Sequence, residues 1–149
     1  MRVTLQDIIA NAVRKEQAAR KFYLKAKRMT QDPIAKALLE GLAKEEARHA
    51  SLLRGKDVEA FLGSKPPAIQ DLRITEFLVP RRISPNASFQ DVLIYAMKRE
   101  DSSFWAYQAL AEAAEDNKTR MIFRRLAGEE RLHRNKLEKL YDDVIFREN

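Results

Sequence analysis

The stretch Glu130-Arg131-Leu132-His133 places a carboxylate and an imidazole one helical turn apart. The same spacing recurs in Glu46-Ala47-Arg48-His49, and these two stretches contain the only histidines of the 149-residue chain. One Glu-x-x-His pattern alone is typical of ordinary contacts on a helix surface. Two copies at equivalent places in a duplicated chain indicate instead half of a two-metal site.

The chain contains an internal repeat. Residues 16–53 align with residues 100–137 without a gap, and the identical positions are mostly acids, histidines and helix caps rather than generic apolar residues. The sequence therefore predicts two copies of one helical hairpin, related by an approximate two-fold axis. The identical pairs are Glu16/Glu100, Tyr23/Tyr107, Asp32/Asp116, Leu42/Leu126, Ala43/Ala127, Glu45/Glu129, Glu46/Glu130, His49/His133 and Leu53/Leu137.

Apolar residues at three- and four-residue spacing predict four long helices, and the chain has only four glycines and five prolines to interrupt them. Asp32 before Pro33 is a typical helix start, with the acid as N-cap. The expected helices cover residues 4–29, a second from Pro33 to Gly55 or Gly63, a third from after Asn86 or Ser88 to Glu115, and a fourth that Asp116 caps and that runs almost to Asn149.

The segment from Gly63 to Pro85 lacks helical periodicity and is rich in proline. Such a segment of about 23 residues can reach roughly 75 Å, whereas a helix of about 26 residues is about 39 Å long. It is therefore long enough to cross from one end of a bundle to the other. We expect an all-α fold, an antiparallel four-helix bundle with one long crossover between the second and third helices, in which residues 1–149 form one domain.

The amino-acid composition excludes several kinds of site and argues against several classes of protein. The sequence has no cysteine, which excludes disulfides, thiolate nucleophiles and iron–sulfur ligands. No stretch is apolar enough for a signal peptide or a membrane span, so we expect a cytoplasmic protein. The net charge is +6, but the basic residues alternate with acids in helical patterns. They are interpreted as solvated helix faces and not as a nucleic-acid surface.

Two further acids lie on the apolar faces of the other two helices, Glu16 in the first and Glu100 in the third. A carboxylate on a core-facing line is costly unless it is paired or bound to a metal. The predicted metal ligands are therefore Glu16, Glu46, His49, Glu100, Glu130 and His133. One glutamate from each of two helices and one Glu-x-x-His from each of the others is the arrangement of ferritin-like di-iron and di-manganese proteins.

The charge of this set explains why it needs metal. Four carboxylates that converge in a low-dielectric core repel one another and lose their hydration. Two divalent cations would bring the charge of the filled site close to neutral. Oxygen and imidazole donors without thiolates fit iron or manganese, and zinc can also bind. The predicted cofactor is two iron ions per chain, because redox chemistry requires iron or manganese rather than zinc.

Residues 42–49 and 126–133 resemble the paired Leu-Ala-x-Glu-Glu-x-x-His motifs of rubrerythrins, and Glu16 followed by Phe22-Tyr23 resembles their first helix. The resemblance extends over about residues 5–141. It implies a non-haem di-iron centre that reacts with peroxide or dioxygen, and it implies that the second glutamate of each Glu-Glu pair is the ligand. Spacing alone leaves Glu45 and Glu129 open as ligands, since they precede the histidines by four residues.

Two departures from that family bear on function. Rubrerythrins usually have a further glutamate one turn after the third-helix ligand, where this chain has Ser103. The cysteine-ligated rubredoxin domain is also missing, so the expected electron donor is an external, rubredoxin-like protein. By the same resemblance the chain is expected to form a homodimer. Around the ligands, Tyr23 and Tyr107 are predicted core residues that hydrogen-bond ligand carboxylates, and Ser103 is a predicted small neighbour of the site.

These observations predict a non-haem di-iron oxidoreductase that reduces hydrogen peroxide or dioxygen in defence against oxidative stress. A ferroxidase or iron-handling protein without efficient turnover is the first alternative, and Ser103 favours it. A di-iron hydroxylase acting on an organic or RNA substrate is the second, and a purely structural helix bundle is the third.

Overall fold

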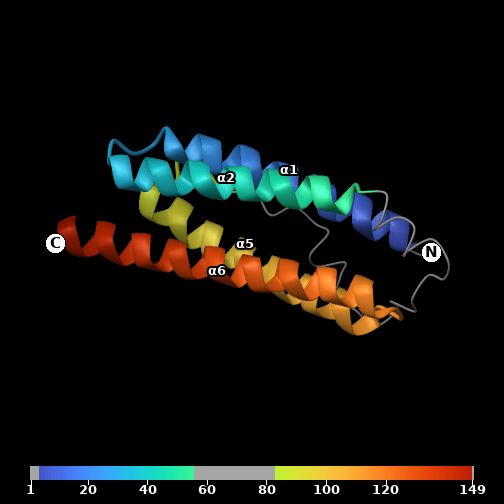
Figure 1. Cartoon of the computed structure of the whole chain (residues 1–149). Helices are drawn as coiled ribbons and strands as arrows, with labels where there is room; N and C mark the ends of the chain where they lie inside the picture. Colours follow the sequence, from blue (N-terminus) through green and yellow to red (C-terminus); the bar gives the residue numbers. More distant parts are fainter. Residues whose placement is uncertain (1–3, 56–82, 149) are drawn as a thin grey trace.

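A computed structural model describes residues 4–55 and 83–148, and these residues form four helices and no strand. Helices α1 and α2 lie side by side as one hairpin, and α5 and α6 form the second hairpin beside it (Figure 1). The predicted all-α four-helix architecture is confirmed. The helices span Leu5–Lys27 (α1), Pro33–Leu53 (α2), Phe89–Ala113 (α5) and Asn117–Glu148 (α6).

Side-chain caps set the starts of the helices. Asp32 accepts a hydrogen bond from the backbone N–H of Ile34, and Pro33 occupies the first helical position of α2, as predicted. In the second hairpin Asp116 accepts hydrogen bonds from the N–H and the hydroxyl of Thr119. Ser88 caps α5 through the N–H of Asp91. These caps satisfy backbone donors that have no partner inside a helix.

Several helix ends differ by one or two residues from the sequence prediction: α1 ends at Lys27 instead of Met29, and α5 ends at Ala113 instead of Glu115. Helix α1 begins one residue later, because Thr4 is its N-cap and forms a reciprocal capping pair with Asp7. Helix α2 ends at Leu53 with Arg54 as its C-cap, so the shorter of the two predicted ends is the closer one. The longer alternative, to Gly63, falls on residues outside the described part of the chain.

Helices α2 and α5 run in the same direction, while α1 and α6 run in the opposite direction (Figure 1). A chain that leaves α2 at one end of the bundle must therefore enter α5 at the other end. This is the arrangement that a crossover between the second and third helices requires. The predicted crossover segment itself, from Gly63 to Pro85, lies almost wholly outside the described residues. No described helix combines the length and the apolar character needed to cross a membrane.

The apolar core consists of two blocks. In every helix, the residues of one block precede the predicted metal ligands and those of the other block follow them. In α1, for example, Val13 belongs to the first block and Ala19 to the second, with Glu16 between them. The predicted ligands therefore form a polar layer that apolar side chains cover on both sides. This position restricts the access of water to the ligands and lowers the local dielectric constant.

Candidate metal centre

The structure brings the six predicted metal ligands together in this central layer. Each comes from the helix predicted to carry it, and each is at most 3% exposed to solvent. Helix α1 contributes Glu16 and α5 contributes Glu100, while the Glu-x-x-His pairs come from α2 and α6. Because three residues make almost one helical turn, the glutamate and the histidine of each pair project from the same face.

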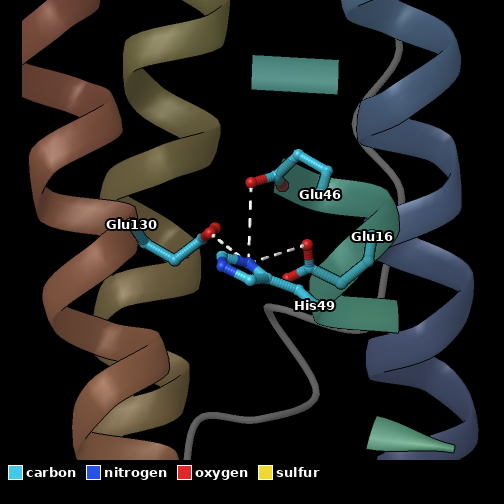
Figure 2. Close-up of side chains that lie close together, drawn as sticks. All are labelled: Glu16, Glu46, His49 and Glu130. Atoms are coloured by element: carbon cyan, nitrogen blue, oxygen red, sulfur yellow. Dashed lines mark ion pairs between the residues drawn. The ribbon is translucent and has the colours of Figure 1, made fainter. Parts of the chain in front are cut away.

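The ligands form two overlapping groups. Within each group the donor atoms all lie within 4.8 Å of one another, which is close enough to share one ion. Glu46 and Glu130 belong to both groups, so their carboxylates lie between the two candidate ion positions. The first group is Glu16, Glu46, His49 and Glu130 (Figure 2), and the second is Glu46, Glu100, Glu130 and His133.

The two groups have similar internal geometry. His49 Nδ1 lies 2.9 Å from Glu130 Oε1, 3.4 Å from Glu16 Oε2 and 3.7 Å from Glu46 Oε1 (Figure 2). In the second group, His133 Nδ1 lies 2.9 Å from Glu46 Oε1, 3.5 Å from Glu130 Oε1 and 3.7 Å from Glu100 Oε1. Each imidazole Nδ1 thus lies closest to the shared glutamate of the opposite hairpin, and we call these two shared residues, Glu46 and Glu130, the bridging glutamates.

The hydrogen bonding of the donor atoms indicates whether metal ions fit this site. Buried polar atoms in proteins nearly always have a hydrogen-bond partner. Among the described residues, the buried side-chain nitrogen and oxygen atoms that lack one belong, with the exception of one oxygen of Glu129, to the six predicted ligands. Both oxygens of Glu130 and the Nδ1 atoms of both histidines are among them. Inward-facing carboxylate and imidazole donors without hydrogen-bond partners fit a pair of divalent cations.

The electrostatics of the metal-free site support the same interpretation. Burial, together with the neighbouring carboxylates of Glu100 and Glu16, holds the pKa of both Glu46 and Glu130 well above its usual range. Burial acts to lower the pKa of His133, but the carboxylates of Glu100 and Glu46 outweigh this effect and raise it to about 11. Without metal, the layer therefore retains protons to limit the repulsion between its acids.

Two tyrosines bind the non-bridging carboxylates across the bundle. The Tyr107 hydroxyl on α5 donates a hydrogen bond to Glu16 Oε1 on α1 at 2.6 Å, and the Tyr23 hydroxyl on α1 donates one to Glu100 Oε1 on α5. Burial and the adjacent carboxylate raise the pKa of each tyrosine well above its usual value, so both remain hydrogen-bond donors. In each glutamate the other oxygen, Oε2, has no hydrogen-bond partner and remains available to an ion.

The first glutamate of each Glu-Glu pair has a different place from the second. Glu45 Oε2 lies 3.0 Å from Nε2 of His133, and Glu129 Oε2 lies 3.3 Å from Nε2 of His49. Each of these acids is therefore behind the histidine of the opposite hairpin, on the side away from the two central donor groups. A carboxylate in this position can accept the second ring N–H of a metal-bound histidine and fix its orientation, and of the two pairs only Glu45 and His133 form this hydrogen bond. Spacing in the sequence did not predict these contacts between hairpins.

Two other residues, Ser103 and Arg48, lie within one helical turn of a predicted ligand in the sequence. Ser103, predicted as a small neighbour of the site, is half-buried on α5 one turn after Glu100, where it adds no charge to the donor set. Arg48, for which no sequence pattern predicts a place in the site, donates a hydrogen bond to Glu129. This contact raises the pKa of the guanidinium above its already high value. The only sequence signal for the contact is the position of Arg48 beside a ligand histidine.

Solved structures show the same fold, and a family of known proteins matches the C-terminal part of the chain. The rubrerythrin family matches residues 91–149, which include Glu100, Glu130 and His133. A hypothetical protein from Pyrococcus furiosus superposes with a TM-score of 0.74 and 25% identity, over 95% of this chain and 90% of that one. A candidate ferritin-like di-iron-carboxylate protein from Thermotoga maritima superposes with a TM-score of 0.70 and 18% identity, over 95% of this chain and 97% of that one. No curated protein matches the sequence.

Proposed function

We propose that the chain is a non-haem di-iron oxidoreductase that reduces hydrogen peroxide or dioxygen, because the rubrerythrin family matches its residues 91–149. The observation that carries this proposal is the pair of buried donor groups that share Glu46 and Glu130. Two ferrous ions held there would supply the two electrons that, with two protons, convert one hydrogen peroxide to two waters.

The charge and the donor types of the ligand residues determine which metal ions the site favours. Four carboxylates carry a charge of −4 when ionised, and two divalent cations balance it, so the filled layer is far less repulsive than the empty one. The absence of thiolate donors in this cysteine-free chain favours iron or manganese over softer metals. The apolar blocks above and below the layer limit the access of water, which strengthens each ion–carboxylate contact.

The tyrosines hold the non-bridging glutamates in position. Each tyrosine occupies one carboxylate oxygen and leaves the other free. A carboxylate that is held in this way does not have to reorient when an ion binds, so less conformational entropy is lost on binding. The same hydrogen bonds connect α1 to α5, which belong to different hairpins. The cross-bundle pairs therefore keep the two halves of the donor set in register.

Repeated turnover would require an electron donor that reduces the oxidised metal pair. The sequence has no cysteine and therefore no iron–sulfur ligands of its own. The proposed electron donor is a separate redox protein of the rubredoxin type, and the proposed assembly is a homodimer.

A second candidate function is iron handling, in which ferrous iron is oxidised once and then released. Ser103 favours it, because this residue provides no further carboxylate beside Glu100. The two functions differ in turnover. An oxidoreductase consumes many equivalents of peroxide per site when a reductant is present, whereas an iron-handling protein oxidises its own iron once.

Anaerobic reconstitution tests the proposal. The metal-free protein is titrated with ferrous iron and then mixed with hydrogen peroxide, with and without an added reductant. We expect two irons per chain, fast oxidation by peroxide and repeated turnover when the reductant is supplied. E46Q removes a bridging carboxylate charge and should lose iron, whereas E40Q makes the same change at a half-exposed acid of the same helix and should not. If the wild-type chain bound no iron under these conditions, the proposed function would be wrong.

A further inference from the structure

One contact breaks the two-fold equivalence of the donor layer. Arg48, on α2 next to His49, donates a hydrogen bond to Glu129 Oε1 on α6, and its Nη2 lies 3.7 Å from Glu45 Oε2. The equivalent position in the second hairpin is Leu132, whose side chain is 57% exposed. A single guanidinium thus acts on the two carboxylates that lie behind the histidines, and it binds one of them much more closely.

The two histidines differ in a way that follows this contact. His133 Nε2 and Glu45 Oε2 form a hydrogen bond of 3.0 Å. On the other side, His49 Nε2 and Glu129 Oε2 are 3.3 Å apart, and neither atom has a hydrogen-bond partner. The carboxylate that Arg48 binds is therefore the one that fails to hold its histidine.

This difference bears directly on metal affinity. A carboxylate that accepts the outer N–H of a ligand histidine fixes its tautomer and makes the inner nitrogen a stronger donor, and the loss of such a contact typically costs 10–100-fold in affinity. Arg48 also places a positive charge on the Glu129 side. That charge is partly screened because the side chain is 48% exposed.

We propose that Arg48 makes the two ion positions unequal, so that the position of His133 and Glu100 binds a divalent cation about tenfold or more tightly than that of His49 and Glu16. The inference rests on the proposed two-metal centre but not on its reaction with peroxide. Arg48 is a positioning residue here, because it acts on the ion through Glu129 and His49.

Besides Arg48, a second cationic side chain, that of Lys136, acts on Glu45. Lys136 acts electrostatically on Glu45, although no ion pair within 4 Å joins the two among the described residues. Lys136 does not interrupt the hydrogen bond between Glu45 and His133. The inequality is therefore assigned to the direct hydrogen bond from Arg48, and the experiment changes that bond while Lys136 is retained.

Anaerobic titration of the metal-free protein with cobalt(II) measures the two binding steps separately from any activity. Each cobalt-bound histidine gives a strongly shifted N–H signal in the proton NMR spectrum, and the chain has only two histidines. E45Q changes the acceptor of His133 alone and so assigns the two signals. We expect the signal of His133 to appear during the first equivalent and that of His49 during the second.

The internal repeat provides matched variants. R48L introduces the residue of the equivalent position, and the two signals should then grow together. L132R places a second guanidinium opposite Glu45, and this variant should also equalise the two steps. In the double variant R48L/L132R the order should reverse, with His49 first. Circular dichroism shows whether each variant retains its helices, and the single and double variants provide independent tests.

The possible results separate the two proposals. If two cobalt ions bind but R48L and the double variant leave the order unchanged, Arg48 does not set the inequality and the inference is wrong, while the two-metal centre stands. Simultaneous loading of both positions in the wild-type chain would overturn it as well. Binding of fewer than two ions would overturn both the inference and the proposed function.

Discussion

Tyr107 on α5 and Glu16 on α1 form a 2.6 Å hydrogen bond across the centre of the bundle, and both side chains are at most 3% exposed. The bond joins the two hairpins at the level of the donor layer. It also leaves Glu16 Oε2 without a partner, directed at the same group as His49 Nδ1. A single hydroxyl therefore contributes both to the packing of the hairpins and to the orientation of a metal ligand.

Removing this hydroxyl should weaken metal binding without unfolding the bundle. Y107F leaves Glu16 Oε1 without its donor, so the carboxylate can rotate, and we expect a 10–100-fold loss of affinity for the ion that Glu16 binds. Cobalt(II) titration measures this loss. Y141F, which removes a hydroxyl that accepts a hydrogen bond from Gln90 away from the donor layer, is the control and should bind normally. Unchanged binding in Y107F would show that Tyr107 serves packing alone.

The stability of the metal-free protein should fall as the pH rises. The folded-state pKa values of Glu46, Glu130 and His133 are all raised, the last to about 11. A group with a raised folded-state pKa stabilises the fold fully below its unfolded-state value and loses that contribution as the pH rises towards the folded-state value. Thermal melts in a chelator should therefore show a Tm that falls by several degrees or more between pH 5 and pH 9. A Tm that rises over this interval would contradict the assigned protonation of the layer.

Metal binding should become stronger as the pH rises, and it should therefore stabilise the protein more at high pH than at low pH. Because an ion replaces the protons held by Glu46, Glu130 and His133, binding releases protons and the apparent affinity increases with pH. The Tm difference between metal-loaded and chelator-treated protein should accordingly widen from pH 5 to pH 8. Calorimetric titration in buffers with different ionisation enthalpies measures the number of protons released. A binding enthalpy that does not depend on the buffer would contradict the prediction.

The cap of α6 should contribute to stability independently of the metal. Asp116 accepts hydrogen bonds from Thr119, which hold the pKa of its carboxyl below the usual value. D116A should destabilise the fold by about 1 kcal/mol, which corresponds to a Tm lower by about 2–4 °C. The wild-type advantage should be present above the unfolded-state pKa near 3.8 and be lost as the pH falls below it.

D32A removes the corresponding cap of α2 and serves as the matched variant. Both variants should bind two cobalt ions, since neither residue touches the donor layer. Loss of metal in D116A alone would show that the start of α6 positions Glu130 and His133.

Much of the fold could be predicted from local sequence signals. Asp32, Ser88 and Asp116 mark helix starts because their short side chains accept backbone hydrogen bonds, which depends only on neighbouring residues. The placement of Glu16 and Glu100 in the core followed from their position on apolar helix faces. The repeat then predicted that the two hairpins contribute equivalent donors, and the structure places those donors in one layer.

Other features depend on how the hairpins meet, which local spacing does not contain. Glu45 and Glu46 both precede His49 by about one turn, so spacing could not tell which of them faces the interior. In the structure Glu45 reaches His133 of the other hairpin instead. The contact from Arg48 to Glu129 likewise joins residues that are far apart in the sequence. Such contacts are decided by the distance and angle between helices.

The sandwich of one polar layer between two apolar blocks also fixes how the four helices align along the bundle axis. Leucine and alanine side chains tolerate sliding by one turn, since one apolar residue then replaces another. A slide of α6 by one turn would instead move Glu130 among leucines and leave the other carboxylates without their shared ions. Ion binding therefore favours one relative position of the helices along the bundle axis, which apolar packing alone would not select.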